Sequence, residues 1–281
     1  MKKRNRVLAL AIAVAMFATG CASDSTDGVS ELLARSGETM AGVTNYSAVM
    51  DMDLVMSMMG DEVSSTTTAE VITFADPLKM KMDMTMEISG AGSQDIKMYV
   101  QEVDGELVSY MHMEGMGWIA AGVDMASMGQ YNAVDNATMY LNVMSDVKEN
   151  GTEDINGVKT TRIDGVISGE GMKDAAIASG VMSSVESMGL TEEEVLKIYE
   201  AMGGMPISMW ISEDGYVYKY EFDMSEMMKQ VMDQMLAELG AVEGMDLVIS
   251  RAVVSMTCDD FNTAEDFEIP DEALNAEVMS Y

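Results

Sequence analysis

The sequence predicts an α+β fold in which helices cover one face of a large antiparallel β-sheet. Long segments in the first half of the chain alternate strictly between apolar and polar residues, which is the period of strands with one buried face. The middle and the end of the chain add segments with helical spacing between further strands. No stretch rich in proline, glycine or serine divides the chain, so we expect a single domain.

Residues 1–20 have the composition of a secretion signal. Four basic residues precede an apolar run from Val7 to Thr19, which is too short to span a membrane. The segment Ala18-Thr19-Gly20-Cys21 resembles the lipobox of bacterial lipoproteins. This resemblance implies cleavage before Cys21, a diacylglycerol on its sulfur and acylation of the new amino terminus, for instance by palmitate. Cleavage without lipid attachment and an uncleaved membrane anchor remain as alternatives.

A lipid on Cys21 predicts a protein anchored to the extracytoplasmic side of the cell membrane, because two or three acyl chains hold a protein there stably. Residues 21–28 are small and polar after the cysteine, which predicts a flexible tether. The segment Val29–Thr44 then carries apolar residues at helical spacing and predicts an amphipathic helix. The single domain is expected to occupy residues 29–281.

The first half of the chain predicts a meander of at least five strands. Alternation is cleanest from Leu78 to Ser89, where methionines face one side and charged or polar residues face the other. A two-residue hairpin turn is expected at Asp104-Gly105. The five predicted strands are Tyr46–Met58, Val63–Ala75, Leu78–Ser89, Gln94–Val103 and Glu106–Met113.

The second half predicts helices that alternate with strand pairs. The expected helices are Asn136–Val147, Gly169–Met188, Thr191–Met202 and one from a Ser225 cap to Leu239. The expected strands are a pair around Asn156-Gly157 between Glu153 and Ser168, a hairpin of Pro206–Ser212 with Tyr216–Met224, and a last strand from Asp246 to Phe261. After this strand a short acidic tail is expected, which Pro270 terminates.

The chain is strongly acidic, with a formal net charge of −32. Removal of residues 1–20 takes away four basic and no acidic residues, which leaves a net charge of −36. Such a surface repels nucleic acids and anionic headgroups, so we expect no nucleic-acid partner and a membrane contact made by the lipid. After lipidation Cys258 is the remaining thiol, and its apolar strand predicts a small buried side chain.

Several segments together resemble the LolA/LppX-like superfamily of bacterial lipoproteins, and within it an uncharacterised methionine-rich group. They are Asn45-Tyr46-Ser47, the Trp210-bearing stretch Pro206–Gly215, Val253–Asn262 and Phe267-Glu268-Ile269-Pro270. The resemblance implies a curved half-barrel of antiparallel strands with helices packed on its concave face. It also implies a cavity that accepts acyl chains, and it brings no catalytic residues.

Motifs of enzymatic chemistry are missing from the sequence. His112 is the single histidine and has no metal-ligand partners at suitable spacing. Ser145 and Lys148 match Ser-x-x-Lys, but the accompanying motifs of that enzyme class are absent. The acidic run after Cys258 lacks the spacing and the glycine of a calcium-binding EF-hand loop. We therefore predict no catalytic residue, no metal site and no cofactor, and a protein that is not an enzyme.

Methionine is the unusual component, with 34 residues in the chain. Its flexible thioether side chain forms adaptable apolar surfaces. The residues expected to line an apolar cavity are Met50, Met52, Met56, Met80, Met82, Met84 and Met86. Two other hypotheses stay open: a copper(I) site of thioether ligands, and a filled core in a structural or partner-binding lipoprotein. Any strand with a methionine-based core produces Met-x-Met, so the pattern alone does not require a metal.

Overall fold

The computed structural model describes residues 25–58, 60–123, 128, 132–178, 204–238 and 247–279. The signal segment 1–20, Cys21 and the helix expected at Thr191–Met202 lie outside the described residues, as does the end of the helix expected at Gly169–Met188. No helix among the described residues is long and apolar enough to cross a membrane.

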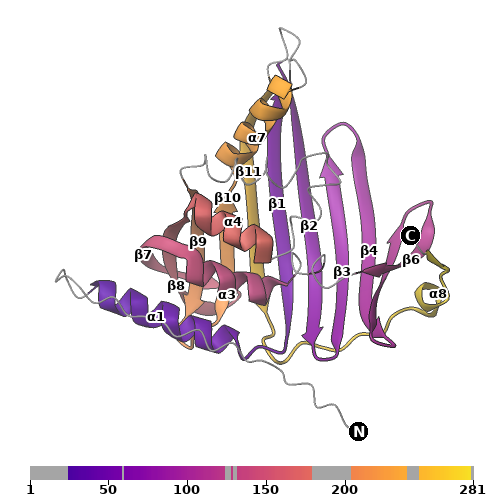
Figure 1. Ribbon diagram of the computed structural model, residues 1–281, viewed down its shortest axis with the longest axis horizontal. Helices are drawn as coiled ribbons and strands as arrows, with labels where there is room; N and C mark the ends of the chain where they lie inside the picture. Colours follow the sequence, from indigo (N-terminus) through magenta and orange to yellow (C-terminus); the bar gives the residue numbers. More distant parts are fainter. Residues whose placement is uncertain are drawn as a thin grey trace.

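Twelve strands form one open sheet in the order β12-β6-β5-β4-β3-β2-β1-β11-β10-β9-β8-β7 (Figure 1). The strands are β1 (Asn45–Met58), β2 (Asp61–Ala75), β3 (Leu78–Ile88), β4 (Gly92–Val103), β5 (Glu106–Met113), β6 (Gly117–Val123), β7 (Met144–Ile155), β8 (Val158–Ile167), β9 (Met205–Ser212), β10 (Val217–Asp223), β11 (Leu247–Asp259) and β12 (Val278–Met279). Neighbouring strands are antiparallel, except that β12 runs parallel to β6. The curved sheet is a half-barrel, so the α+β fold class is confirmed.

The register of β1, β2 and β3 follows the predicted alternation. Met50 lies opposite Ala69, and Ala69 lies opposite Met84, so the alternate apolar residues of three strands share one face. Lys81 and Asp83, which alternate with these methionines, lie on the other face. A slip by one residue would expose the whole apolar set, which is why the pattern specifies the register.

The described helices are α1 (Ser25–Met40), α3 (Ala133–Val143), α4 (Gly169–Ala178), α7 (Ser225–Glu238) and α8 (Asp271–Leu274). In Figure 1, α3, α4 and α7 lie over β9, β10 and β11, and none of the described helices is drawn over β2, β3 or β4. The ring of Tyr140 in α3 packs on Phe222 of β10, with 4.6 Å between the ring centroids. The described helices therefore lie over only part of the concave face.

Two hydrogen bonds attach the helices to the sheet at defined points. The buried Tyr46 hydroxyl of β1 accepts a hydrogen bond of 2.9 Å from the backbone N–H of Ala133, at the start of α3. The Ser225 hydroxyl accepts a hydrogen bond of 2.9 Å from the backbone N–H of Ala252 in β11. Ser225 is the first residue of α7. We expected its hydroxyl to cap this helix, but the hydroxyl binds the neighbouring strand instead.

The chain after β11 crosses the convex face, where we expected only a short acidic tail. The amine of Lys79 forms a 2.7 Å ion pair with Asp266 and also donates to the carbonyl oxygen of Phe267. The Phe267 ring packs against Tyr99, with ring centroids 6.0 Å apart. Ala273 of α8 is buried, and β12 then adds to the edge strand β6. The packing of this segment was not predicted because its composition is mainly acidic, and only its few apolar residues make the contacts.

Three further boundaries differ from the expectation. The helix α1 begins at Ser25, so residues 25–28 are helical and shorten the expected tether. Serine, threonine and aspartate favour the first turn of a helix, which explains why this polar stretch is not a free linker. The helix expected to reach Val147 ends at Val143, because Met144 is extended and opens β7. Strand β6 was not expected.

Candidate functional site

Burial on the concave face changes along each central strand. In β3, Met80 and Met82 are buried at 3% exposure each, Met84 and Met86 are half-buried, and Ile88 is 38% exposed. These five residues share one face because they alternate along the strand. The same apolar row therefore starts in the packed core and ends in a much less covered position, towards the upper end of β3 in Figure 1.

Strand β1 loses burial along its first half and regains part of it at Leu54 and Met56, which are half-buried. Tyr46 and Ala48 are buried, Met50 is half-buried, and Met52 is 36% exposed. The contact between the Tyr46 hydroxyl and the start of α3 explains the buried end, since it holds a helix over that part of the sheet. The exposed Met52 lies beyond this contact.

We call the less covered part of this surface the open half of the concave face. It comprises Met50, Met52, Leu54 and Met56 of β1, Val63, Ser65, Thr67 and Ala69 of β2, Met84, Met86 and Ile88 of β3, and Gln94 and Ile96 of β4. Most of these residues are half-buried or exposed, and the small residues of β2 form the buried floor. All of them are uncharged.

The residues predicted to line a cavity divide between two environments. Met50, Met52, Met56, Met84 and Met86 belong to the open half. Met80 and Met82 belong to the buried core, where they pack with Val71 and Val100. Five of the seven predicted residues therefore lie outside the buried core, and two of these five, Met50 and Met84, pack partly against it.

Thr67 is a site residue that the sequence analysis did not single out. It lies in β2 directly opposite Met52 on one side and Met86 on the other. The residue is 4% exposed, and its hydroxyl has no hydrogen-bond partner. The signal was present in the sequence, because strict alternation puts this polar residue on the same face as the methionines.

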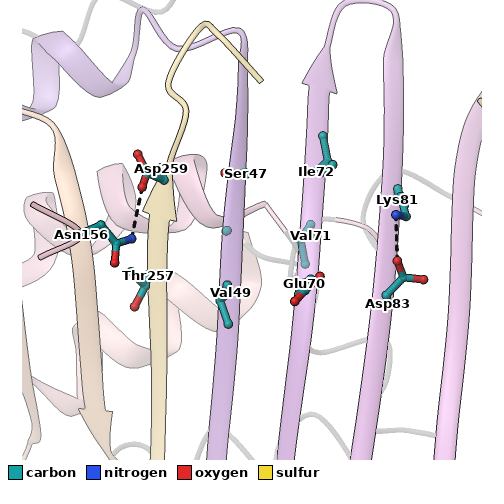
Figure 2. A pocket seen from close by; sticks show the side chains of 11 residues that line it. Ser47, Val49, Glu70, Val71, Ile72, Lys81, Asp83, Asn156, Thr257 and Asp259 are labelled. Carbon is teal, nitrogen blue, oxygen red and sulfur yellow. Dashed lines mark hydrogen bonds and ion pairs between the residues drawn. The ribbon is translucent and has the colours of Figure 1, made fainter. Parts of the chain in front are cut away.

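The convex face carries a small pocket of about 210 Å³ lined by both polar and apolar side chains (Figure 2). The Lys81 amine forms a 2.8 Å ion pair with Asp83 at one side, and the hydrogen bond to Asp83 raises the pKa of Lys81. At the other side the Asn156 amide donates a 3.2 Å hydrogen bond to Asp259. The volume is below the ~300 Å³ at which ligand sites usually begin, and the lysine is already neutralised, so this pocket is a weaker candidate.

The described residues offer no constellation for catalysis. No group of three or more His, Cys, Asp or Glu side chains in the described ranges could hold a metal ion. The ring of His112 packs against Trp118, with 5.1 Å between centroids. Trp210 is buried on the convex face, with the Arg162 guanidinium 5.0 Å and the Lys219 amine 4.6 Å from its ring centroid.

The thiol of Cys258 is buried in β11, and burial raises its pKa to about 12. We expect a thiol reagent at pH 8 to label the native chain at least about a hundredfold more slowly than the urea-unfolded chain, because access requires opening of the core. The measurement is absorbance of the released chromophore, in a Cys21→Ser chain that retains this one thiol. Fast native labelling would show that β11 is not buried as described.

The raised pKa of Cys258 also predicts a direction for alkaline stability. The folded state favours the neutral thiol, so this contribution to stability is fully present below the ordinary pKa of 9.0 and is lost as the pH rises towards about 12. Burial raises the pKa of Tyr220 in the same sense. The urea concentration at the midpoint of unfolding should therefore decrease as the pH is raised above 9.

Comparison with known proteins identifies the fold and the family. LprF from Mycobacterium bovis superposes with a TM-score of 0.50 at 10% identity, over 89% of this chain and 100% of that chain. LppX, a lipoprotein from Mycobacterium tuberculosis, gives 0.43 at 16% identity over 88% and 100% of the two chains. The likeness to LprF shows a shared fold and supports the LolA/LppX-like architecture.

No curated protein matches the sequence. A family model described as "Family of unknown function (DUF6612)" matches residues 28–278, which is nearly the whole folded part. The chain therefore belongs to the DUF6612 family.

Proposed function

We propose that this protein is a lipid-anchored extracytoplasmic lipoprotein that binds an apolar ligand, such as a lipid acyl chain, on the open half of the concave face. The observation that carries the proposal is the decrease of burial from Met80 to Ile88 along β3, together with the exposed Met52 of β1. A purely structural protein would cover such an apolar row along its whole length, because exposed apolar area is costly. Here the row leaves the core while it is still methionine-rich and uncharged.

Methionine suits this role for a physical reason. Its side chain is unbranched and has three rotatable bonds, so a row of methionines can follow the shape of different guests. Met50, Met52, Met84 and Met86 come from two strands separated only by β2, and the small residue Ala69 between them leaves room for their side chains. The resulting surface favours burial of a flexible chain over recognition of one rigid shape.

The proposed anchor would hold this face near a source of lipid. Because α1 begins at Ser25, only three residues separate it from Cys21, and four Cα steps span at most ~14 Å. The distance between the membrane and the open half would then depend on the dimensions of the folded domain more than on the length of the tether.

Filling the open half tests the proposal. We expect Met84→Trp or Met86→Trp to weaken uptake of a fluorescent fatty-acyl probe by about tenfold, because the larger ring occupies space that the ligand needs. Titration of the purified Cys21→Ser chain measures the effect without a competing anchor. Glu87→Trp is the matched control, since Glu87 is exposed on the convex face of the same strand.

Uptake should change little between low and high salt, because apolar burial supplies the affinity. Stoichiometric copper(I) binding without probe uptake would instead establish the metal hypothesis, provided that it depends on the methionines of β3. In that case the binding should be lost when Met80, Met82, Met84 and Met86 become leucine. Absence of both ligands would leave a structural or partner-binding role.

A further inference from the structure

We infer that the Thr67 hydroxyl holds an uncharged oxygen of the ligand, so that the open half accepts a neutral acyl ester in preference to a hydrocarbon or a fatty-acid anion. The inference rests on the proposed function and names the ligand class and the residue that selects it. Two independent observations support it: a buried hydroxyl without a partner, and a surrounding surface without charge.

The first observation is the position of Thr67 within its row. The strands place Val254, Met52, Thr67, Met86 and Gln94 side by side across the concave face, from β11 to β4. Residues directly opposite each other in an antiparallel pair have Cβ atoms only about 5 Å apart. A chain lying on Met52 and Met86 would therefore pass directly over the threonine.

The unpartnered hydroxyl has a chemical consequence. A buried polar group without a hydrogen bond destabilises the protein, and most such groups in native structures have a partner. The Thr67 hydroxyl can donate one hydrogen bond and accept others, which suits an ester carbonyl. Its neighbour Met52 is 36% exposed and flexible, so its movement would give a ligand oxygen access to the hydroxyl.

The second observation is that none of the described residues assigned to the open half is charged. The open half contains no lysine, arginine or histidine that could neutralise a carboxylate. Transfer of an ionised carboxylate to an apolar surface is strongly unfavourable unless it is paired. The net charge of the chain is −32, which opposes an anion further. A neutral ester avoids both costs and keeps the hydrogen bond.

Thr73 provides an internal comparison on the same strand. It is equally buried on the same face, but it lies opposite Tyr46 and Met80, at the end where Tyr46 contacts the start of α3. A ligand on the open half would not reach it. Replacement of Thr73 by valine thus makes the same chemical change at a position without contact to the ligand.

The experiment compares methyl laurate, laurate and dodecane as competitors of the fluorescent acyl probe, with the Cys21→Ser chain at pH 8. We expect methyl laurate to bind three- to tenfold more tightly than dodecane, about the value of one hydrogen bond, and at least about tenfold more tightly than laurate. Thr67→Val should abolish the preference for the ester over dodecane. Thr67→Ser should restore it, and Thr73→Val should leave it unchanged.

Each outcome decides between the two proposals. An unchanged ester preference in Thr67→Val, or laurate binding as tight as that of the ester, would overturn the inference while the apolar site stands. Failure of the unsubstituted Cys21→Ser chain to bind the probe or any of the three compounds would overturn the proposed function and the inference with it. Urea unfolding of each valine variant checks that the fold is intact.

Discussion

Met82→Asp is expected to unfold the domain, or to lower its free energy of unfolding by at least about 4 kcal/mol. Met82 is buried in the core, between Val71 of β2 and Met98 of β4 in the sheet register. Loss of a buried methionine side chain alone costs about 2–5 kcal/mol, and an unpaired carboxylate adds a desolvation penalty. Domains of this kind have a total free energy of unfolding of about 5–15 kcal/mol, so the substitution removes a large part of it. Urea unfolding followed by circular dichroism measures it.

Ile88→Asp is the matched control because it introduces the same carboxylate on the same strand and the same face. Ile88 is 38% exposed, so water can solvate the new charge. We expect a loss of no more than about 1 kcal/mol. Equal losses for the two variants would mean that the burial gradient along β3 is not as described.

Cys21→Ser is expected to move the protein from the membrane fraction to the soluble extracytoplasmic fraction. The proposed lipid is the anchor, because two or three acyl chains bind a bilayer stably and a single chain only marginally. The acidic chain adds no attraction to anionic headgroups, so we expect membrane association to fall by at least about tenfold. Metabolic labelling with an acyl analogue, combined with fractionation, measures both the modification and the location.

Cys258→Ala separates lipid attachment from a general effect of removing cysteine. Cys258 is buried in β11, so its replacement should leave acyl labelling and membrane association unchanged. Persistent labelling of Cys21→Ser at the membrane would disprove lipidation at Cys21. Membrane association without any labelling would favour an uncleaved signal anchor instead.

The strands that carry the candidate site could be predicted from local patterns. Strict alternation in β1 and β3 indicates which side chains share a face, because successive side chains of a strand point to opposite sides. The hydrophobic pattern also specifies their register with β2, since a slip would expose every methionine. The uncharged character of the open half follows from the same residues.

The boundary between α3 and β7 was not visible in the local sequence. Met144 and Val147, in the segment after Val143, are three positions apart, which suits a helix and not a regular strand, so the local pattern favoured the wrong element. Pairing with β8 decides the outcome, because the strand gains hydrogen bonds from a partner further along the chain. The path of the C-terminal segment over the convex face likewise depends on distant contacts, such as that of Lys79 with Asp266.

The sequence by itself determined that alternate methionines share one face of long strands, that this face is uncharged, and that the chain carries a lipoprotein-like signal. Only the tertiary structure decided which of those methionines are core and which remain accessible. The reason is physical: the alternation of β3 is the same at Met82 and Met86, and their burial differs through what covers them. Such long-range contacts cannot be read from a local pattern, and one of them joins the Tyr46 hydroxyl of β1 to the backbone N–H of Ala133 at the start of α3, 87 positions away.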